Sequence, residues 1–273
     1  MRYETKRPPV AVILAAGAGS QPRPLNDAPP KSLLSVGGSA ILERTIRNCL
    51  SCGISQFVLV LGDRSDEVKR FVDKAFRGVR ITYVATDRHH GGDTAHSLLL
   101  AAPAIGGAEF VRFDANVVFD VAILRRLVDC EIPDILCVDR EIPLEDREAR
   151  VIVDGQMRVL EIGESVDPGS ATGEAIGIEK ISAKTGPLLF AELARMMDDP
   201  AYDQARCEAA YARLAAGGAA FHALDITGST WIEIDSAEDL DAANIMFKSP
   251  ITTMPRGLQL TRGATTAKET TPG

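Results

Sequence analysis

Short apolar runs alternate with longer amphipathic stretches through the first half of the chain. Runs such as AVILAA, FVLVLG and RITYVA are rich in β-branched residues, and FVRFD and DILCVD follow later. Because parallel strands need crossover helices between them, this alternation is typical of βαβ units. We therefore predict an α/β fold with a Rossmann-like, doubly wound and mostly parallel sheet over about residues 8–139. The helices predicted between its strands are Ala40–Cys52, Ser65–Ala75, Asp93–Ala102 and Val121–Cys130.

The pattern changes after Asp139, where a charged connector leads into RVIVDG and QMRVLEIG. Asp154-Gly155 between these two runs predicts a hairpin turn. The run GEAIGIEKIS predicts another strand, and FHALDI and TWIEID two more. We expect a smaller lobe over about 140–247, followed by a flexible Thr/Pro/Gly/Lys-rich tail over 248–273. The helices predicted in this part are Ala183–Met197, Tyr202–Ala216 and Ala237–Phe247.

Composition narrows the class of protein. A chain of 273 residues can bury a sizeable core, and a formal net charge of −8 argues against a nucleic-acid partner. The apolar run Val10–Ala16 is too short for a signal peptide or a membrane span. The cysteines are odd in number and lie in apolar-periodic segments, so we expect reduced thiols in a cytoplasmic protein. Cys49 and Cys52 form a C-x-x-C, but no second Cys/His pair stands at zinc spacing.

The segment LAAGAGSQPRPLNDAPPK begins at Leu14, at the end of the first predicted strand, where open α/β sheets bind ligands. Gly17 and Gly19 leave backbone N–H groups accessible to an anion, and the prolines that follow prevent a helix. A dinucleotide fingerprint would need a glycine at Pro22, and a Walker loop would need Gly-Lys-Ser/Thr. Neither fits, which counts against a dinucleotide-dependent oxidoreductase. A lone G-x-G after a strand is equally consistent with a structural turn.

The segment continues through Lys31 into LLSVGG and SAILERTI. The whole resembles the L-A-A-G-x-G-[ST]-R…P-K…L…V-x-G-x-P-x-L pattern of the sugar-phosphate and phosphoalcohol nucleotidyltransferases, which have a GT-A-like fold. The similarity covers roughly Val10–Phe247, and ILERTIRNCLSCGISQFVLVLG and EAIGIEKIS look most similar to the cytidylyltransferases acting on phosphocholine, phosphonates or inositol phosphate. This resemblance implies transfer of CMP from CTP to a phosphorylated or phosphonate acceptor, with release of pyrophosphate. It also implies that Lys31 neutralises phosphate and that the nucleotide is held by Leu14, Ala15, Ala16, Gly17, Gly19 and Ser20.

One residue departs from the family pattern. The catalytic arginine that follows the Ser/Thr is Gln21 here. An amide donates hydrogen bonds but carries no charge to offset the phosphates in the transition state. Arg23 is the nearest replacement, so Lys31, Arg23 and Gln21 are the expected catalytic group. The alternative is a catalytically impaired protein that binds a nucleotide or sugar nucleotide.

Phosphoryl chemistry of this kind calls for Mg²⁺, held by a few carboxylates. Asp114 ends the strand FVRFD, where the resembled family has a metal-binding aspartate; without that resemblance, a helix N-cap or loop residue is the simpler interpretation. In TWIEIDSAEDL, Glu233 and Asp235 lie two apart on a strand and point to one face. We expect Asp235 as the second metal ligand, with Glu233 either a further ligand or a surface acid.

The remaining contacts are to the base and the acceptor. By resemblance, the region HHGGDTAHS meets the nucleobase and ribose through Gly92, Asp93, His96 and Ser97, although Asp93 is equally an N-cap. In GEAIGIEKIS, Gly177 permits a close approach, and Glu174 could bind an acceptor hydroxyl or ammonium; this strand is also explained as core. Aromatic residues at 5% do not favour a choline cage. The sequence leaves the oligomeric state open, a homo-oligomer included.

Overall fold

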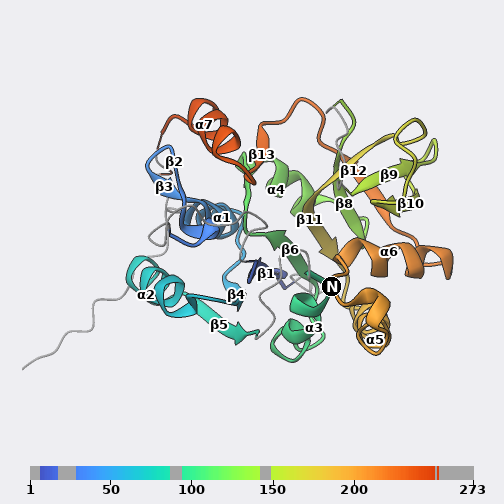
Figure 1. The fold of residues 1–273 in the computed structure, drawn as a ribbon, viewed down its shortest axis with the longest axis horizontal. Helices are drawn as coiled ribbons and strands as arrows, with labels where there is room; N and C mark the ends of the chain where they lie inside the picture. The colour runs from blue at the N-terminus through green and yellow to red at the C-terminus, as the bar shows by residue number, and fades with distance from the viewer. Residues whose placement is uncertain (1–6, 18–28, 87–93, 142–148, 250, 252–273) are drawn as a thin grey trace, which may run out of the picture.

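A computed structural model describes residues 7–17, 29–86, 94–141, 149–249 and 251. Within these ranges, nine strands form one sheet in the order β10-β9-β11-β6-β1-β4-β5, with β8 paired to β11 and β12 paired to β8 (Figure 1). The strands of this sheet are β1 (Val10–Ala15), β4 (Gln56–Leu61), β5 (Arg80–Ala85), β6 (Phe110–Asp114), β8 (Ile135–Asp139), β9 (Arg150–Val153), β10 (Val159–Gly163), β11 (Gly173–Ile181) and β12 (His222–Asp225).

The centre of the sheet is parallel. β1 lies between β6 and β4, β5 follows β4, and all four strands run in the same direction. The apolar runs of β1, β4 and β6 are explained by burial, because helices cover both faces of a parallel sheet, whereas the edge strand β5 is only partly buried. Leu14 pairs in register with Asp114, so the carboxyl ends of β1 and β6 lie side by side. The predicted doubly wound α/β fold is confirmed.

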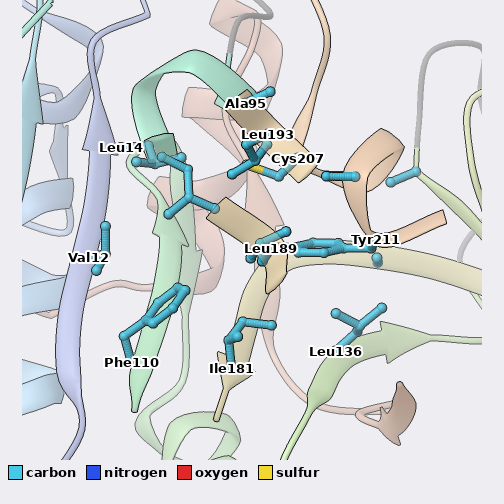
Figure 2. Packing of buried hydrophobic residues seen from close by; sticks show 14 of the residues in the cluster. Val12, Leu14, Ala95, Phe110, Leu136, Ile181, Leu189, Leu193, Cys207 and Tyr211 are labelled. Carbon is cyan, nitrogen blue, oxygen red and sulfur yellow. The ribbon is translucent and has the colours of Figure 1, made fainter. Parts of the chain in front are cut away.

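Helices cover the two faces of the sheet in separate layers. Val12 and Leu14 of β1 pack towards α3, α5 and α6, and Figure 2 shows this core around Phe110, Leu189 and Tyr211. Ala11 and Ile13 point to the opposite face and pack towards α1, α2 and α4. The alternation along β1 places each side chain in one of two cores. The helices are α1 (Ile41–Ser51), α2 (Ser65–Ala75), α3 (Thr94–Ile105), α4 (Val121–Asp129), α5 (Gly186–Met197), α6 (Cys207–Ala216) and α7 (Ala237–Met246).

The strand β11 does not follow the simple alternating pattern. It lies between β6 and β8 and is antiparallel to both. β8 therefore runs in the same direction as β6, as predicted, but it does not pair with the central parallel strands; its parallel partner is β12. Local periodicity identifies a buried strand but does not record its neighbours, so the insertion of a strand from the second half was not visible in the sequence.

Two of the predicted helices in the second half begin later than expected. α5 begins at Gly186 instead of Ala183, because the carboxylate of Asp134 accepts hydrogen bonds from the Ser182 N–H and the Thr185 hydroxyl and holds these residues in a turn. The predicted helix Tyr202–Ala216 is divided into a 3₁₀ turn, η2 (Pro200–Tyr202), and α6. Between them, the carbonyl of Ala205 accepts a hydrogen bond from Ala95 at the start of α3.

The predicted hairpin of β9 and β10 is confirmed, with a longer loop than a two-residue turn. Val153 pairs with Val159, and residues 154–158 close the hairpin. The left-handed backbone conformation falls on Met157, at φ 62°. The Asp154 carboxylate accepts hydrogen bonds from the N–H groups of Gln156 and Arg158, which accounts for the wider loop.

Short elements bring the end of the chain to the carboxyl edge of the sheet. β7 (Val117–Phe119) follows β6 directly and pairs with β13 (Trp231–Glu233), and α7 begins after Ser236 in a capping box with Asp239. A hairpin of β2 (Ser35–Val36) and β3 (Ser39–Ala40) follows η1 (Lys31–Leu33). All five cysteines carry free thiols. Over the described ranges, no helix has the length and apolar character needed to cross a membrane.

Candidate active site

The candidate site lies where β1 and β6 end. Leu14 is buried and its side chain belongs to the core, so only its backbone reaches this edge, followed by Ala15, Ala16 and Gly17. A side-chain carbon built on Gly17 would meet no described atom within 4 Å. The start of the Gly-rich loop is therefore open, as a phosphate-binding loop requires. Six predicted residues lie outside the described residues: Gly19, Ser20, Gln21, Arg23, Gly92 and Asp93.

The predicted catalytic lysine and the predicted metal-binding aspartate contact each other. Lys31 is the first residue of η1, and its ammonium donates a 2.7 Å hydrogen bond to Oδ1 of Asp235. The two side chains are 26% and 62% exposed, so both are accessible to a ligand. The structure thus joins the loop after β1 to the segment after β13.

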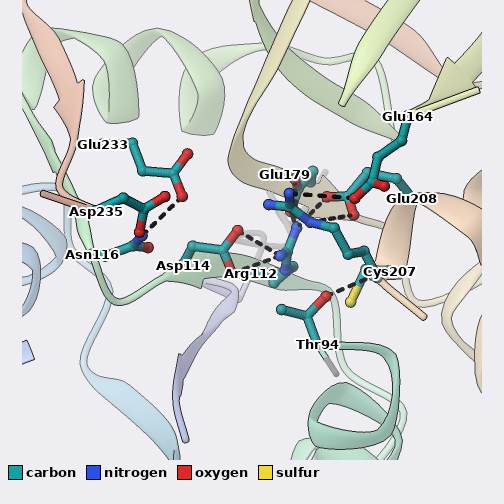
Figure 3. Close-up of polar contacts among 11 residues, drawn as sticks. Thr94, Arg112, Asp114, Asn116, Glu164, Glu179, Cys207, Glu208, Glu233 and Asp235 are labelled. Atoms are coloured by element: carbon teal, nitrogen blue, oxygen red, sulfur yellow. Dashed lines mark hydrogen bonds and ion pairs between the residues drawn. The ribbon is translucent and has the colours of Figure 1, made fainter. Parts of the chain in front are cut away.

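Glu233 and Asp235, the two acids near the end of the chain, share a hydrogen-bond donor. The amide of Asn116, two residues beyond β6, donates to Oε1 of Glu233 at 2.8 Å and to Oδ1 of Asp235 at 3.1 Å (Figure 3). Glu233 and Asp235 therefore point the same way, as predicted. Burial, together with the charges of Asp235 and Asp114, raises the pKa of Glu233 to about 7. The interpretation of Glu233 as a surface acid is wrong, since this side chain is half-buried within the acidic group.

Asp114 is buried beside an arginine that the prediction did not include. Nη2 of Arg112 lies 2.6 Å from Oδ1 and 2.7 Å from Oδ2 of Asp114. Burial raises the pKa of Asp114, although the charge of Arg112 opposes this rise. A side-chain carbon on Gly177 would overlap Oδ2 of Asp114. The group that approaches Gly177 closely is thus the side chain of Asp114. Asp114 is the last residue of β6 and is not a helix N-cap.

Arg112 is the centre of a buried ion network. It is fully buried, and its Nη1 donates to Glu179 at 2.8 and 2.9 Å and to Glu208 at 3.1 Å (Figure 3). These carboxylates come from β11 and from the first turn of α6, so the network links these two elements to the end of β6. The sequence feature that could have indicated this network is an arginine inside the apolar run FVRFD, because a buried charge needs partners.

A second missed cation is Arg206, directly before α6. Burial opposes its charge, but the carboxylates of Glu208, Asp114 and Glu233 raise the pKa of Arg206 above its usual value. Its side chain is 28% exposed. Arg206 therefore presents a permanent positive charge close to Asp114 and Glu233.

The predicted acceptor and base residues lie near this edge but in separate places. Glu174 is buried at the start of β11 and pairs in register with Asp139 of β8. The Asp139 carboxylate accepts a 2.8 Å hydrogen bond from the buried indole of Trp231. His96 and Ser97 lie in the first turn of α3, with Ser97 buried and His96 half-buried.

The acids suit a magnesium ion better than a fully protein-enclosed metal. Among the described residues, no three His, Cys, Asp or Glu side chains form a group that could hold a metal ion. Mg²⁺ usually takes one or two carboxylates and keeps water or phosphate oxygens in its other positions. The crowding that raises the pKa of Glu233 is the electrostatic situation that a bound cation relieves. Asp114 with Asp235 or Glu233 provides that number of ligands.

A parallel sheet with a lysine and a group of acids at the carboxyl edge of its central strands is an arrangement suited to an enzyme that handles nucleotide phosphates. Residues 10–131 match the family model described as nucleotidyl transferase. Over this part, the chain is similar to the nucleotidyltransferase family, as the segment from Leu14 to Lys31 predicted.

Individual relatives cover more of the chain. It is 27% identical over 249 residues to the CMP-5'-(3-aminopropyl)phosphonate synthase of Streptomyces rubellomurinus, covering 88% of this chain and 39% of that protein. It is 27% identical over 244 residues to the bifunctional IPC transferase and DIPP synthase of Aquifex aeolicus, covering 85% of this chain and 50% of that protein. The chain thus spans half or less of these two curated relatives.

The fold also matches solved structures. The CTP:phosphocholine cytidylyltransferase of Streptococcus pneumoniae superimposes with a TM-score of 0.72 at 21% identity, covering 88% of this chain and 100% of the other. At this identity the likeness establishes the fold alone. It agrees with the mixed, mostly parallel sheet described above.

Proposed function

We propose that this protein transfers a nucleoside monophosphate, CMP from CTP, to a phosphorylated or phosphonate small molecule and releases pyrophosphate. The observation that carries the proposal is the contact of Lys31 with Asp235 at the carboxyl edge of the sheet. This contact pairs a partly exposed ammonium with an exposed carboxylate, which supports a role for both in binding phosphate and metal. The activities of two similar proteins, a CMP-phosphonate synthase and a CTP:phosphocholine cytidylyltransferase, support the nucleotide and the acceptor class.

The proposed chemistry needs no protein nucleophile. An oxygen of the acceptor phosphate or phosphonate attacks the α-phosphorus of the NTP in line, and the bond to the bridging oxygen of pyrophosphate breaks. A phosphate monoester with a second pKa of about 6 is already largely dianionic near neutral pH, so no general base is required. Catalysis then rests on alignment and on neutralising negative charge.

Two cations of the chain are suited to that task. Lys31 can exchange Asp235 for a phosphate oxygen, because both side chains are partly exposed. Arg206, whose guanidinium lies 3.8 Å from the Glu208 carboxylate, supplies a second positive charge that interacts electrostatically with Asp114 and Glu233. Since Gln21 replaces the family's arginine, we assign part of its electrostatic role to Arg206, in addition to the role expected of Arg23.

Mg²⁺ is the proposed cofactor, and Asp114 and Asp235 are its proposed ligands, with Glu233 the alternative. When bound, Mg²⁺ would neutralise phosphate charge and orient the triphosphate. Asn116 would orient the late acids through its amide hydrogen bonds. Glu174 is proposed to face the acceptor, and the engagement of Trp231 with Asp139 leaves no support for an aromatic cage.

The deciding experiment measures pyrophosphate release with CTP, UTP, dTTP, ATP and GTP against a panel of acceptors. The panel contains an aminoalkyl phosphonate, phosphocholine, an inositol phosphate and a sugar 1-phosphate. We expect release with CTP and at least one phosphorylated or phosphonate acceptor. Nucleotide binding without release in every pairing would identify a binding protein instead. Gln21→Arg is the follow-up variant, and an increase in rate of several orders of magnitude would mean that neither Arg23 nor Arg206 replaces the missing arginine.

A further inference from the structure

We propose that Arg112 and Gly177 restrict Asp114 to one metal-binding oxygen, so that the site prefers Mg²⁺ and Mn²⁺ to Ca²⁺. This inference rests on the metal-dependent transfer proposed above. Arg112 touches neither nucleotide nor acceptor in that proposal, and it acts through Asp114 as a positioning residue.

The first restriction comes from the guanidinium. A single nitrogen of Arg112, Nη2, lies 2.6 Å from Oδ1 and 2.7 Å from Oδ2 of Asp114 (Figure 3). A donor almost equidistant from both oxygens occupies the position that a chelated ion would take between them. Asp114 therefore cannot bind a metal ion through both oxygens while Arg112 is in place.

The second restriction comes from the neighbouring strand. Gly177 has a φ of +72° and lies where the pairing of β11 with β8 shifts register. Oδ2 of Asp114 fills the space that a side-chain carbon on Gly177 would occupy. With Arg112 on one side and the backbone of β11 on the other, Oδ2 is enclosed. Oδ1 is the oxygen left for a metal ion.

Arg112 is held too firmly to be displaced by an incoming cation. Its Nη1 donates to both oxygens of Glu179 and to Glu208, and the side chain is fully buried. Moving the guanidinium would leave buried carboxylates without their counter-charge, which is among the larger penalties in a protein interior. The coordination mode of Asp114 is thereby fixed before any metal ion binds.

The ligand requirements of the two metal ions explain why one available oxygen favours Mg²⁺ over Ca²⁺. Ca²⁺ takes six to eight oxygens and often binds a carboxylate through both, whereas Mg²⁺ takes six ligands in a stricter octahedron and keeps several waters. An acid that offers one oxygen meets the needs of Mg²⁺ or Mn²⁺ and deprives Ca²⁺ of a ligand. The exposed Asp235 carries no such restriction, so the selectivity belongs to Asp114.

The test follows Mn²⁺ bound to the full chain by electron paramagnetic resonance, with the non-reactive nucleotide α,β-methylene-CTP present and the nucleotide alone as the blank. Mg²⁺ and Ca²⁺ are then titrated as competitors. We expect Mg²⁺ to displace Mn²⁺ at a concentration roughly tenfold below that of Ca²⁺. Equal competition by the two ions in the wild-type chain, or no bound Mn²⁺ beyond the blank, would overturn the proposal.

Arg112→Lys is the informative variant, because one ammonium keeps the charge but cannot hold Asp114 and Glu179 in two directions. We expect the preference for Mg²⁺ over Ca²⁺ to shrink several-fold in this variant. Arg150→Lys is the matched control, since Arg150 is also buried but donates to the carbonyls of Glu164 and Val166. An unchanged ratio in folded Arg112→Lys overturns the proposal. If Arg112→Lys does not fold, the wild-type ratio decides alone.

These results are separable from the proposed function. Pyrophosphate release with equal Mg²⁺ and Ca²⁺ competition would reject the inference and leave the transferase intact. Selective Mn²⁺ binding without release in any pairing would reject the transferase and leave the coordination argument intact.

Discussion

The ammonium of Lys31 and the carboxylate of Asp235, 204 positions apart in the chain, form a 2.7 Å ion pair at the carboxyl edge of the sheet. In this structure, each of the two charged side chains is the ion-pair partner of the other. A triphosphate would attract Lys31 and a divalent cation would attract Asp235, so ligand binding exchanges this pair for two new ones. The pair thus orients both groups before substrate arrives.

Lys31→Met should remove the mobile cation. We expect pyrophosphate release to fall roughly 10²- to 10³-fold, the usual cost of losing one transition-state electrostatic partner. The steady-state rate under saturating substrate is the measurement. Lys74→Met, an exposed lysine of α2, is the control and should leave the rate unchanged. A rate for Lys31→Met within a few-fold of wild type would remove Lys31 from the catalytic group.

Asp235→Asn and Glu233→Gln distinguish the two candidate metal ligands. We expect Asp235→Asn to raise the Mg²⁺ concentration for half-maximal rate more than Glu233→Gln does, because Asp235 is the more exposed acid. Chelation by EDTA should abolish release from the wild type, and Mg²⁺ should restore it. Glu238→Gln, an exposed acid of α7, is the control. The reverse order of effects would assign the ligand to Glu233.

Gly177→Ala should damage both stability and activity. The left-handed backbone at φ +72° and the overlap with Asp114 would each strain an alanine. We expect the free energy of unfolding to fall by about 2 kcal/mol or more. Urea denaturation measures this loss. Gly155→Ala is the matched control, because a carbon there meets no described atom within 4 Å. Equal stability of the two variants would contradict the packing of Asp114 on Gly177.

Asp239→Asn tests the cap of α7. Partial burial opposes ionisation, but hydrogen bonds from Ser236 and from the backbone N–H of Asp235 outweigh it and lower the pKa of Asp239 below 3.8. A lowered pKa means that the ionised group stabilises the fold above pH 3.8, and that this contribution is lost as the pH falls through the folded value.

We therefore expect Asp239→Asn to cost about 1 kcal/mol at pH 7, the usual size of a capping interaction. The difference from wild type should shrink as the pH falls below about 4, where the wild-type carboxyl becomes protonated. Urea denaturation across this range is the measurement, with the exposed Asp241→Asn as the control. A difference that does not change with pH would contradict the assignment.

Local patterns were sufficient for most elements of the fold. The strands β1, β4 and β6 were predicted because their apolar runs are buried on both faces. The edge strand β5 is only partly buried but has a β-branched run, and α2 spans the predicted Ser65–Ala75. The position of β11 was not predictable in this way, because pairing between distant strands leaves no local periodicity.

The same distinction between local patterns and long-range contacts applies to the residues of the site. Lys31, Asp114 and the late acids were found because each belongs to a motif with a chemical role. Arg112, Asn116 and Arg206 were missed because their importance lies in contacts made across the fold, with Glu179, Glu233 and Glu208 among the partners. A charged residue in an apolar strand indicates that such partners exist but does not identify them.

The place of β11 between β6 and β8 also has a consequence for biosynthesis. A chain emerging from the ribosome cannot complete the edge of β6 until residue 181 has been made, since the two strands beside β11 are already synthesised and wait for it. During that interval the edge of β6 and both edges of β8, whose second partner β12 is made later still, are open to pairing with other chains. A polypeptide ending near residue 140 would keep these edges exposed permanently, and would be expected to aggregate in spite of containing the whole parallel centre of the sheet.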